Sequence, residues 1–422
     1  MTARILDDLA WRGLIANSTD PSALGDELAA GEITFYCGFD PTAPSLQFGN
    51  LMQLVTMRRL QLDGHLPIVV VGGATGLIGD PSGRSTERSL NEAEVVADWA
   101  ARIRAQVERL LDFSGPGPAR IVNNLEWTAG LSTLDFLRDV GKHFSVNRML
   151  DKESVSARLQ GPGISFTEFS YQVLQAFDYL ELFRRYGCRL QTGGSDQWGN
   201  LTAGVDLIRR VTGTTVHALV TPLITKADGT KYGATADGAL WIDPELTSPY
   251  AFYQYFLNAD DADVGALLRI FSFRSRVEIE ALEAEVAQRP EGRAAQQALA
   301  TELTGMVHGT EAAIQAASAS AALFGRGELE ALEAEVLAAA LSELPQAEVG
   351  DAMPTIGDLL VATGLAESRT AARRTVADGG AYLNNRRVAD PELVPAETDL
   401  LHGRWLLLRR GKRSLAAVQK VS

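Results

Sequence analysis

The sequence contains few cysteines and no long hydrophobic run. Only Cys37 and Cys188 occur among 422 residues. Two cysteines are too few for a disulfide framework or a cysteine-ligated zinc site, and their scarcity is typical of a reducing compartment. No stretch approaches the roughly 18 apolar residues of a membrane-spanning helix, and residues 1–15 lack the apolar core of a secretory signal. We therefore expect a cytoplasmic protein that does not enter a membrane.

Basic residues are outnumbered, but they are unevenly distributed. The formal net charge is −14, yet 11 Lys and Arg stand against 8 Asp and Glu from Asp351 onward, so this stretch carries +3 and the remainder −17. A mildly basic module on an acidic body is suited to contacting a polyanion at selected places. Composition alone leaves open that the basic stretch is only a solvated face.

The first half of the chain alternates short β-branched runs with helical patterns. The strand-like runs lie at 33–37, 68–71, 121–122, 188–191 and 218–224. This alternation predicts βαβ units, and hence an α/β domain with a mostly parallel sheet. Ligands of such sheets bind beyond the carboxyl ends of the strands. Each motif described below falls near one of those ends.

The remainder of the chain predicts two further domains, as its length requires. The pattern is helical from Ser248 to about Gly325, and two short helices and a hairpin follow after Pro354. We expect an α/β domain over 1–245, an all-helical domain over 246–335, a linker over 336–350 and a small α+β domain over 351–422. In the last domain Arg369, Arg373 and Arg374 lie on one predicted helix, which suggests RNA binding through phosphates and shape.

The first motif runs from Tyr36 to Asn50, from a strand through a turn into a helix. Gln47 and Asn50 lie three residues apart and share a face at the helix start. Gly49 between them lets a nucleotide approach the backbone, and the helix N-terminus offers N–H groups to phosphate. A capped helix after a strand is commonplace, so a structural role stays open.

The second motif is the glycine-rich loop from Val71 to Gly83. Its glycines do not match the dinucleotide fingerprint, so a nicotinamide or flavin site is not supported. Asp80 in this loop is placed to bind a substrate ammonium group, and Arg84 and Arg88 after it are placed to bind phosphate.

The third motif places Tyr171, Gln175 and Asp178 on one face of a predicted helix. Burying three polar groups is costly unless they meet one another or a polar ligand, and both alternatives stay open. In the fourth motif, Gly194, Asp196 and Gln197 follow a strand, where a carboxylate suits ribose hydroxyls and a helix cap is the alternative.

The fifth motif, from Lys226 to Thr235, is a glycine-containing polar loop with Lys226 and Lys231. A mobile loop of this kind can deliver cations to phosphates.

Together, in this order and spacing, the motifs closely resemble those of the bacterial tyrosyl-tRNA synthetases. The resemblance covers essentially the whole chain. It rests on Tyr36-Cys-Gly-Phe-Asp-Pro-Thr-Ala, Gly-Gly-Ala-Thr-Gly-Leu-Ile-Gly-Asp-Pro81, Gly-Lys-His-Phe-Ser-Val-Asn147, Phe166-Thr-Glu-Phe-Ser-Tyr and Gly193-Gly-Ser-Asp-Gln-Trp-Gly-Asn. It implies a class I synthetase with a Rossmann-like catalytic domain that dimerises through an insertion, a helical tRNA-binding domain and a ribosomal-protein-like RNA-binding domain.

The resemblance also implies substrates and residue roles. The substrates are L-tyrosine, ATP with Mg²⁺, and tRNA, with no tightly bound metal ligated by the protein. Tyr36 and Asp178 are implied to contact the tyrosine hydroxyl, Asp80, Tyr171 and Gln175 its ammonium group, and Gln197 its carboxylate. The ATP site is implied to include Gly38, Asp40, Gly49, Gly194, Asp196, Lys226 and Lys231.

Two positions depart from the family pattern. Gln47 stands where the family normally has histidine, and Ala234 stands where the second signature normally has lysine. A glutamine amide still donates a hydrogen bond but cannot become cationic, and alanine donates none. We therefore expect slower adenylate formation than in an ordinary member, with Lys226, Lys231, Arg84 and Arg88 left to bind pyrophosphate.

Three interpretations follow from these departures. The first is a working tyrosine–tRNA ligase, including an inhibitor-resistant second copy. The second is a diverged copy that uses activated tyrosine or charged tRNA in another pathway. The third is a catalytically inactive RNA-binding protein. The complete amino-acid pocket favours the first.

Overall fold

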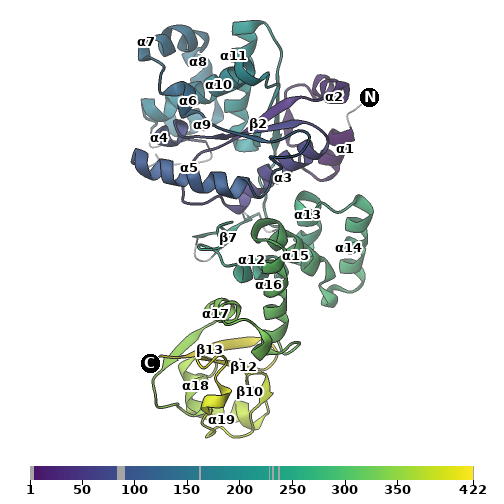
Figure 1. Ribbon diagram of the computed structural model, residues 1–422, viewed down its shortest axis with the longest axis vertical. Coiled ribbons are helices and arrows are strands. Elements are labelled where there is room, and N and C mark those ends of the chain that lie inside the picture. The colour runs from purple at the N-terminus through teal and green to yellow at the C-terminus, as the bar shows by residue number, and fades with distance from the viewer. Residues whose placement is uncertain are drawn as a thin grey trace. The chain divides into compact units, whose positions relative to one another are not determined.

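The chain forms two compact units. The computed structural model describes residues 4–82, 91–160, 163–227, 229–230, 232–235 and 238–421. One unit comprises Met1–Asp243 with Asp261–Ala284, and the other Pro244–Asp260 with Glu285–Ser422. Figure 1 shows the elements of both units as ribbons. Within the described residues, no helix is both long and apolar enough to cross a bilayer.

The first unit is built on a six-stranded sheet of order β1-β6-β5-β2-β3-β4. All neighbouring strands pair in parallel except β1, which is antiparallel to β6. The strands are β1 (Asn17–Ser18), β2 (Thr34–Phe39), β3 (Leu66–Val71), β4 (Arg120–Asn123), β5 (Leu190–Gly194) and β6 (His217–Thr221). The expected parallel sheet is confirmed, and its central strands are buried, as a sheet covered on both faces requires.

The order of the strands creates a crevice at one edge of the sheet. From β2 the chain continues to β3 and β4 on one side, and then returns to β5 and β6 on the other. Loops leaving the carboxyl ends of β2 and β5 therefore run in opposite directions, which is the usual place for a ligand in an open α/β sheet.

Helices cover both faces of this sheet, with α10 and α11 on one face and α3 and α5 on the other (Figure 1). The helices of this unit are α1 (Arg4–Trp11), α2 (Pro21–Ala30), α3 (Phe48–Leu62), α4 (Thr75–Ile78), α5 (Ala93–Val107), α6 (Leu125–Thr128), α7 (Thr133–Asp135), α8 (Val146–Leu150), α9 (Glu153–Leu159), α10 (Phe166–Tyr186), α11 (Trp198–Thr212), α13 (Asp261–Phe271) and most of α14 (Arg276–Gln288). A two-stranded hairpin, β7 (Ala234–Thr235) and β8 (Gly238–Ala239), completes it.

Helix α10 shows how local sequence sets these elements. Ser165 caps its N-terminus by accepting a hydrogen bond from the backbone N–H of Glu168. Gly187 ends it in the left-handed conformation, with a φ of 64° that suits glycine. Both ends are therefore fixed, and with them the angular positions of the side chains between.

The second unit combines a helical part with a small sheet, as the expected fold class describes. Its helices are α12 (Pro249–Leu257), α15 (Ala294–His308), α16 (Thr310–Leu323), α17 (Ala334–Ser342), α18 (Ile356–Ala362) and α19 (Arg369–Ala377). Its sheet has the order β11-β10-β12-β13-β9, with β9 (Gln346–Val349), β10 (Ala381–Leu383), β11 (Arg386–Arg387), β12 (Trp405–Arg410) and β13 (Ser414–Lys420). Asn384 and Asn385 form the expected hairpin turn, with φ of 45° and 64°.

The stretch 336–350, for which the sequence suggests a linker, is ordered as most of α17 and all of β9. Leu337 and Leu341 are fully buried in a core with Trp405 and Leu407. Strand β9 pairs in parallel with β13. The pairing partner lies about seventy residues further along the chain, so local composition did not indicate it.

Candidate active site

A pocket of about 420 Å³ lies at the carboxyl edge of the sheet in the first unit. It is lined by the ends of β2 and β5, the start of α3 and one face of α10. Thirteen of the residues singled out in the sequence line it: Tyr36, Gly38, Asp40, Gln47, Gly49, Asn50, Asp80, Tyr171, Gln175, Asp178, Gly194, Asp196 and Gln197. Arg84, Arg88 and Lys231 lie outside the described residues.

Asp40, directly after β2, joins α10 to the glycine-rich loop. The Tyr171 hydroxyl donates to Asp40 Oδ2 at 2.6 Å, and the Thr75 hydroxyl donates to Asp40 Oδ1 at 2.6 Å. A Cβ on Gly72 would collide with both Asp40 and Thr75. Glycine at position 72 is therefore required for the carboxylate to reach across the crevice.

Asp178 lies at the buried end of the pocket. Trp127 Nε1 donates to Asp178 Oδ1 at 2.8 Å, and Asn124 Nδ2 donates to Asp178 Oδ2 at 2.9 Å. Burial raises the pKa of Asp178 to about 7, although both N–H bonds favour the ionised form. Two donors thus hold the carboxyl group in place, and each oxygen keeps capacity for a further hydrogen bond.

The raised pKa of Asp178 makes stability depend on pH. Because the pKa in the folded state lies above the ordinary 3.8, the folded protein binds a proton that the unfolded chain releases. This contribution to the free energy of unfolding is fully present below pH 3.8 and is lost as the pH rises through about 7. Urea unfolding at about pH 5 and about pH 8 should show wild type losing stability relative to Asp178→Asn, which cannot titrate. An equal difference at both pH values would contradict the raised pKa.

Tyr36 contributes a hydroxyl group to the same end of the pocket. The residue is 1% exposed, and Tyr36 Oη is buried without a hydrogen-bond partner among the described residues. Its ring packs edge to face on Tyr179, with centroids 5.2 Å apart. Burial, and then the neighbouring Asp178, raise the pKa of Tyr36, so the phenol stays protonated. A buried, unsatisfied hydroxyl is costly, which suggests that a polar ligand group completes it.

Three amide oxygens of lining residues are also buried without a hydrogen-bond partner among the described residues: Gln53 Oε1, Gln175 Oε1 and Gln191 Oε1. Gln191 lies on β5 beside the glycine turn. The closed end of the pocket therefore offers several acceptors to a small, polar ligand.

Asp80 and Gln197 are joined across the crevice. Gln197 Nε2 donates to Asp80 Oδ2 at 2.6 Å, and the backbone N–H of Ser82 donates to Asp80 Oδ1 at 2.9 Å. Asn200 Nδ2 in turn donates to Gln197 Oε1 at 3.2 Å. This network holds a carboxylate and an amide in the lining of the pocket, where they can bind an ammonium group and a carboxylate group.

The start of α3 forms another wall of the pocket. Gln47 is the N-cap residue, and its backbone N–H donates to Asn50 Oδ1 at 2.9 Å. Gln47, Gly49 and Asn50 all line the pocket, beside the N-terminal end of the helix. This arrangement suits a phosphate group, because the helix dipole and the first N–H groups favour negative charge.

The described lining is acidic. It includes the carboxyl groups of Asp40, Asp80, Asp178 and Asp196, and the described part has no Lys, Arg or His. Lys226 is not among the lining residues. Its Nζ lies 5.7 Å from the ring centre of Tyr232, and Tyr232 is a lining residue. The pocket therefore attracts an ammonium group, while a polyphosphate needs cations from outside this lining.

Three residues that organise the pocket were missed in the sequence. Thr75 and Asn124 line the pocket. Trp127 does not line it but donates a hydrogen bond to Asp178. Asn124 follows β4, so its place after a strand end was a usable signal. Nothing in the local sequence marks Trp127, because it acts through a residue 51 positions away.

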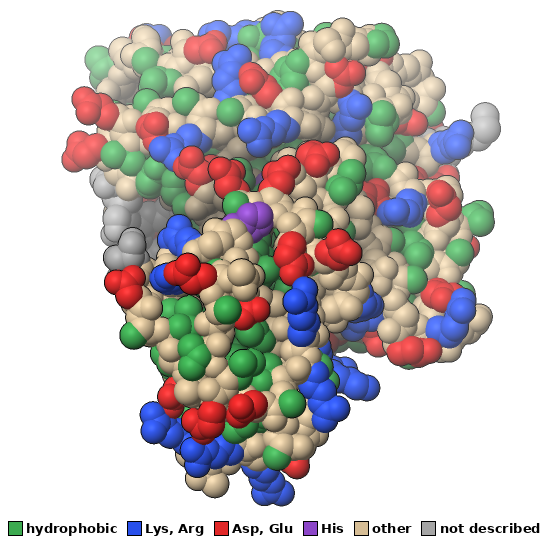
Figure 2. All heavy atoms as spheres, turned by 60° about the horizontal axis from the view of Figure 1, so that its bottom comes forward, with side chains coloured by type: hydrophobic (Ala, Val, Ile, Leu, Met, Phe, Trp, Pro, Cys, Tyr) green, Lys and Arg blue, Asp and Glu red, His purple; other side chains and the backbone are tan. Residues whose placement is uncertain are grey.

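The arginines expected to bind RNA lie on α19 in the second unit. Arg369, Arg373 and Arg374 have side chains 75%, 64% and 85% exposed, and each pairs with a nearby carboxylate. Figure 2 shows Lys and Arg side chains interspersed with Asp and Glu on this C-terminal part of the chain. Exposed pairs of this kind are weak, so phosphates can replace their acidic partners.

Comparison with known proteins identifies the family. Residues 28–325 match the family model described as "tRNA synthetases class I (W and Y)", and residues 335–418 match the "Tyrosine--tRNA ligase SYY-like C-terminal domain". The chain is 61% identical to a tyrosine–tRNA ligase of Streptomyces avermitilis, over 98% of both chains. It is 58% identical to one of Mycobacterium tuberculosis, over 100% of both chains.

Solved structures agree with the sequence relatives. A C-terminally truncated mitochondrial tyrosyl-tRNA synthetase of Aspergillus nidulans superposes with a TM-score of 0.68 at 29% identity, over 74% of this chain and 92% of that one. The chain therefore belongs to the class I tRNA synthetases, and within them to the tyrosine–tRNA ligases.

Proposed function

We propose that the protein is a tyrosine–tRNA ligase whose substrates bind in the pocket at the carboxyl edge of the first unit's sheet. The observation that carries this proposal is that Tyr36 and Asp178 lie near each other in the lining of one pocket, which extends to the ends of β2 and β5 and the start of α3. The tyrosine phenol donates to Asp178, and its ammonium group lies near Asp80, Tyr171 and Gln175. Gln197 orients its carboxylate.

The reaction then has two steps, formation of the tyrosyl adenylate and transfer of tyrosine to tRNA. A carboxylate oxygen of tyrosine attacks the α-phosphorus of ATP in line, the bond to the β-phosphate oxygen breaks, and pyrophosphate leaves. A terminal ribose hydroxyl of tRNA next attacks the activated carbonyl, loses its proton and releases AMP. The pocket accelerates the first step by holding the reacting atoms together and by stabilising the growing charge.

ATP enters as its Mg²⁺ complex in this proposal. Gly38, Asp40, Gly49, Gly194 and Asp196 form the nucleotide part of the lining, and Asp196 suits the ribose hydroxyls. Four carboxyl groups in the described lining repel a triphosphate, so a divalent cation and basic side chains must offset that charge. Lys226, Lys231, Arg84 and Arg88 are the candidates for the basic side chains.

Tyrosine-dependent exchange of pyrophosphate into ATP tests the proposal directly. We expect the purified protein to exchange labelled pyrophosphate only when L-tyrosine and Mg²⁺ are present, and to charge tRNA afterwards. No exchange would reject the proposal in favour of an inactive RNA-binding protein. Exchange without transfer to tRNA would indicate a diverged copy that uses activated tyrosine elsewhere.

We also propose that the protein works as a homodimer in the cytoplasm. Large exposed hydrophobic side chains gather in one stretch of the first unit: Leu125, Leu134, Leu137, Val146, Leu159 and Phe166. Figure 1 shows that α6 to α9, which carry most of them, lie together. We infer that these side chains face a second copy of the chain, because large apolar side chains that gather on a surface mark contacts with other proteins.

The variant Phe166→Glu is expected to be monomeric. Phe166 is 77% exposed and begins α10, where a carboxylate is favourable for the helix but not for an apolar interface. Analytical ultracentrifugation should show about 45.4 kDa for the variant and twice that mass for wild type. The control Val277→Glu, at a residue 75% exposed on α14, should stay dimeric. A dimeric Phe166→Glu would place the interface elsewhere.

A further inference from the structure

The turn that precedes α3 is held from the side by Gln106, at the end of α5. Leu46 N–H donates to Gln106 Oε1 at 2.9 Å, and Gln106 Nε2 donates to Ser45 Oγ at 3.0 Å. The same nitrogen lies 3.4 Å from Asp243 Oδ2. Gln106 is 8% exposed and Ser45 is 4% exposed, so these bonds are shielded from water. One side chain thus binds two consecutive residues of the turn and the segment beside it.

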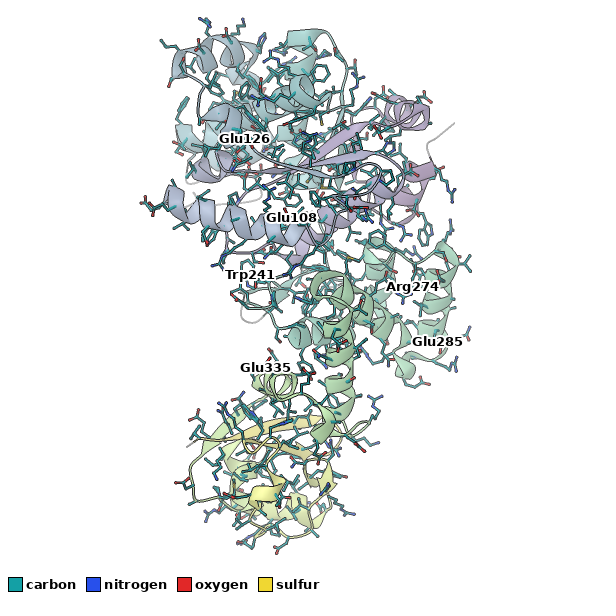
Figure 3. All side chains as sticks on the ribbon, in the orientation of Figure 1. Glu108, Glu126, Trp241, Arg274, Glu285 and Glu335 are labelled. Carbon is teal, nitrogen blue, oxygen red and sulfur yellow. The ribbon has the colours of Figure 1, made fainter. Side chains whose placement is uncertain are left out.

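The other flank of the turn is fixed by a short backbone pairing. Phe48 N–H donates to the Leu240 carbonyl at 3.0 Å, and Ile242 N–H donates to the Leu46 carbonyl at 3.1 Å. Gln47 lies opposite Trp241 in this pairing. Figure 3 labels Trp241 and Glu108, which follows α5. The residues on either side of Gln47 are therefore hydrogen-bonded to residues 240–242 on one flank and to Gln106 of α5 on the other.

We propose that Gln106 is a positioning residue for adenylate formation: it fixes the turn 45–47 so that Gln47 and the first N–H groups of α3 meet the phosphates of ATP. This inference rests on the proposed function. Gln106 is not among the residues that line the pocket. It acts through the backbone of Leu46, one residue before the side chain that reaches the pocket.

The effect of a loose turn on rate follows from geometry. Transition-state charge is stabilised only by donors that are already in place, and a displacement of about 1 Å can cost about a hundredfold in rate. The residues assigned to tyrosine lie on β2, on α10, in the loop that ends at Asp80 and in the turn after β5. The hydrogen bonds of Gln106 within the described residues go to Ser45, Leu46 and Asp243 instead. Loss of Gln106 should therefore lower kcat and leave tyrosine binding unchanged.

The test compares Gln106→Leu and Gln106→Glu with Gln61→Leu in pyrophosphate exchange. The control Gln61 is also a buried glutamine, 9% exposed, and it binds the backbone of Asp112 and Gly117 near the far end of α3. We expect Gln106→Leu to lower kcat at least tenfold, with the KM for tyrosine within about twofold of wild type. Gln106→Glu keeps the acceptor for Leu46 N–H, but it loses the donor to Ser45 and places a carboxylate beside Asp243, so it should also lower kcat. Gln61→Leu should keep the wild-type kcat.

A second measurement separates the two proposals. Amide hydrogen exchange of peptides spanning 44–50 should accelerate in Gln106→Leu and not in Gln61→Leu. If both Gln106 variants have the same kcat as Gln61→Leu, Gln106 is not a positioning residue. If wild type shows no pyrophosphate exchange, the proposed function is rejected. Amide hydrogen exchange would then decide whether Gln106 holds the turn. If Gln106→Leu does not fold, the comparison of Gln106→Glu with wild type decides in the same way.

Discussion

The variant Asp178→Ala should lose about a hundredfold or more in kcat/KM for tyrosine, with little change for phenylalanine. A hydrogen bond to a charged or partly charged group contributes about 1.5–3 kcal/mol, and every 1.4 kcal/mol is tenfold. Removal of Asp178 also leaves Trp127 Nε1 without its acceptor, which adds to the loss of order at this end of the pocket. Phenylalanine has no hydroxyl to lose, so the ratio of the two kcat/KM values should collapse.

The size of this discrimination is a family property. Sites built to hydrogen-bond a substrate hydroxyl reject the analogue without it by about 10⁴–10⁵, and tyrosyl-tRNA synthetase is itself the standard example. In the binding mode proposed above, Tyr36 and Asp178 are the groups that meet the phenol, and their variants test this assignment. Tyr36→Phe removes a neutral hydroxyl and should cost less, about tenfold.

Pyrophosphate exchange with tyrosine and with phenylalanine measures both variants. Urea unfolding at neutral pH serves as the control, since Asp178→Ala is expected to lower stability by roughly 1–3 kcal/mol through its unpaired neighbours. A fully folded Asp178→Ala protein with unchanged selectivity would mean that the phenol binds elsewhere.

The second large effect is a gain of activity in Ala234→Lys. Loss of one preorganised donor to a transition-state oxyanion typically costs about a hundred- to a thousandfold in rate. A lysine at 234, the first residue of β7, supplies a cation where alanine supplies no donor. We therefore expect exchange to rise by up to about a hundredfold, mainly in kcat. Gln47→His should add a smaller gain, because glutamine already donates a neutral hydrogen bond.

The matched control for this gain is Ala234→Gln, which has reach but no charge. It should give much less than lysine if charge on pyrophosphate is what the loop stabilises. A rate for Ala234→Lys equal to wild type would show that Lys226, Lys231, Arg84 and Arg88 already suffice. Rapid-quench measurement of adenylate formation would locate the change in the chemical step.

Much of the pocket follows from local patterns. The residues Tyr171, Gln175 and Asp178 share a helix face because α10 runs uninterrupted from its cap at Ser165, and side chains three and four apart must then align. Asp40 and Asp196 follow strand ends, which parallel pairing brings to one edge of the sheet. Spacing along the chain was sufficient for these positions.

The supporting residues could not be found in this way. Asn124 and Trp127 reach Asp178 across 54 and 51 residues, and Gln106 reaches Leu46 across 60. Such contacts depend on which strands are neighbours and on how helices lie over them, and neither is written in local periodicity. The strands β9, β12 and β13 were missed for a related reason, since a sheet strand is stabilised by distant partners.

The sequence by itself determined the α/β order of elements, many of the residues that line the pocket and the two departures from the family pattern, because periodicity and motif spacing are local properties of the chain. Only the tertiary structure decided that the loops after β2 and β5 enclose one pocket, that Trp127 and Asn124 hold Asp178, and that Gln106 fixes the turn before α3. These facts arise when segments far apart in sequence pack together, and burial then gives their few hydrogen bonds their strength.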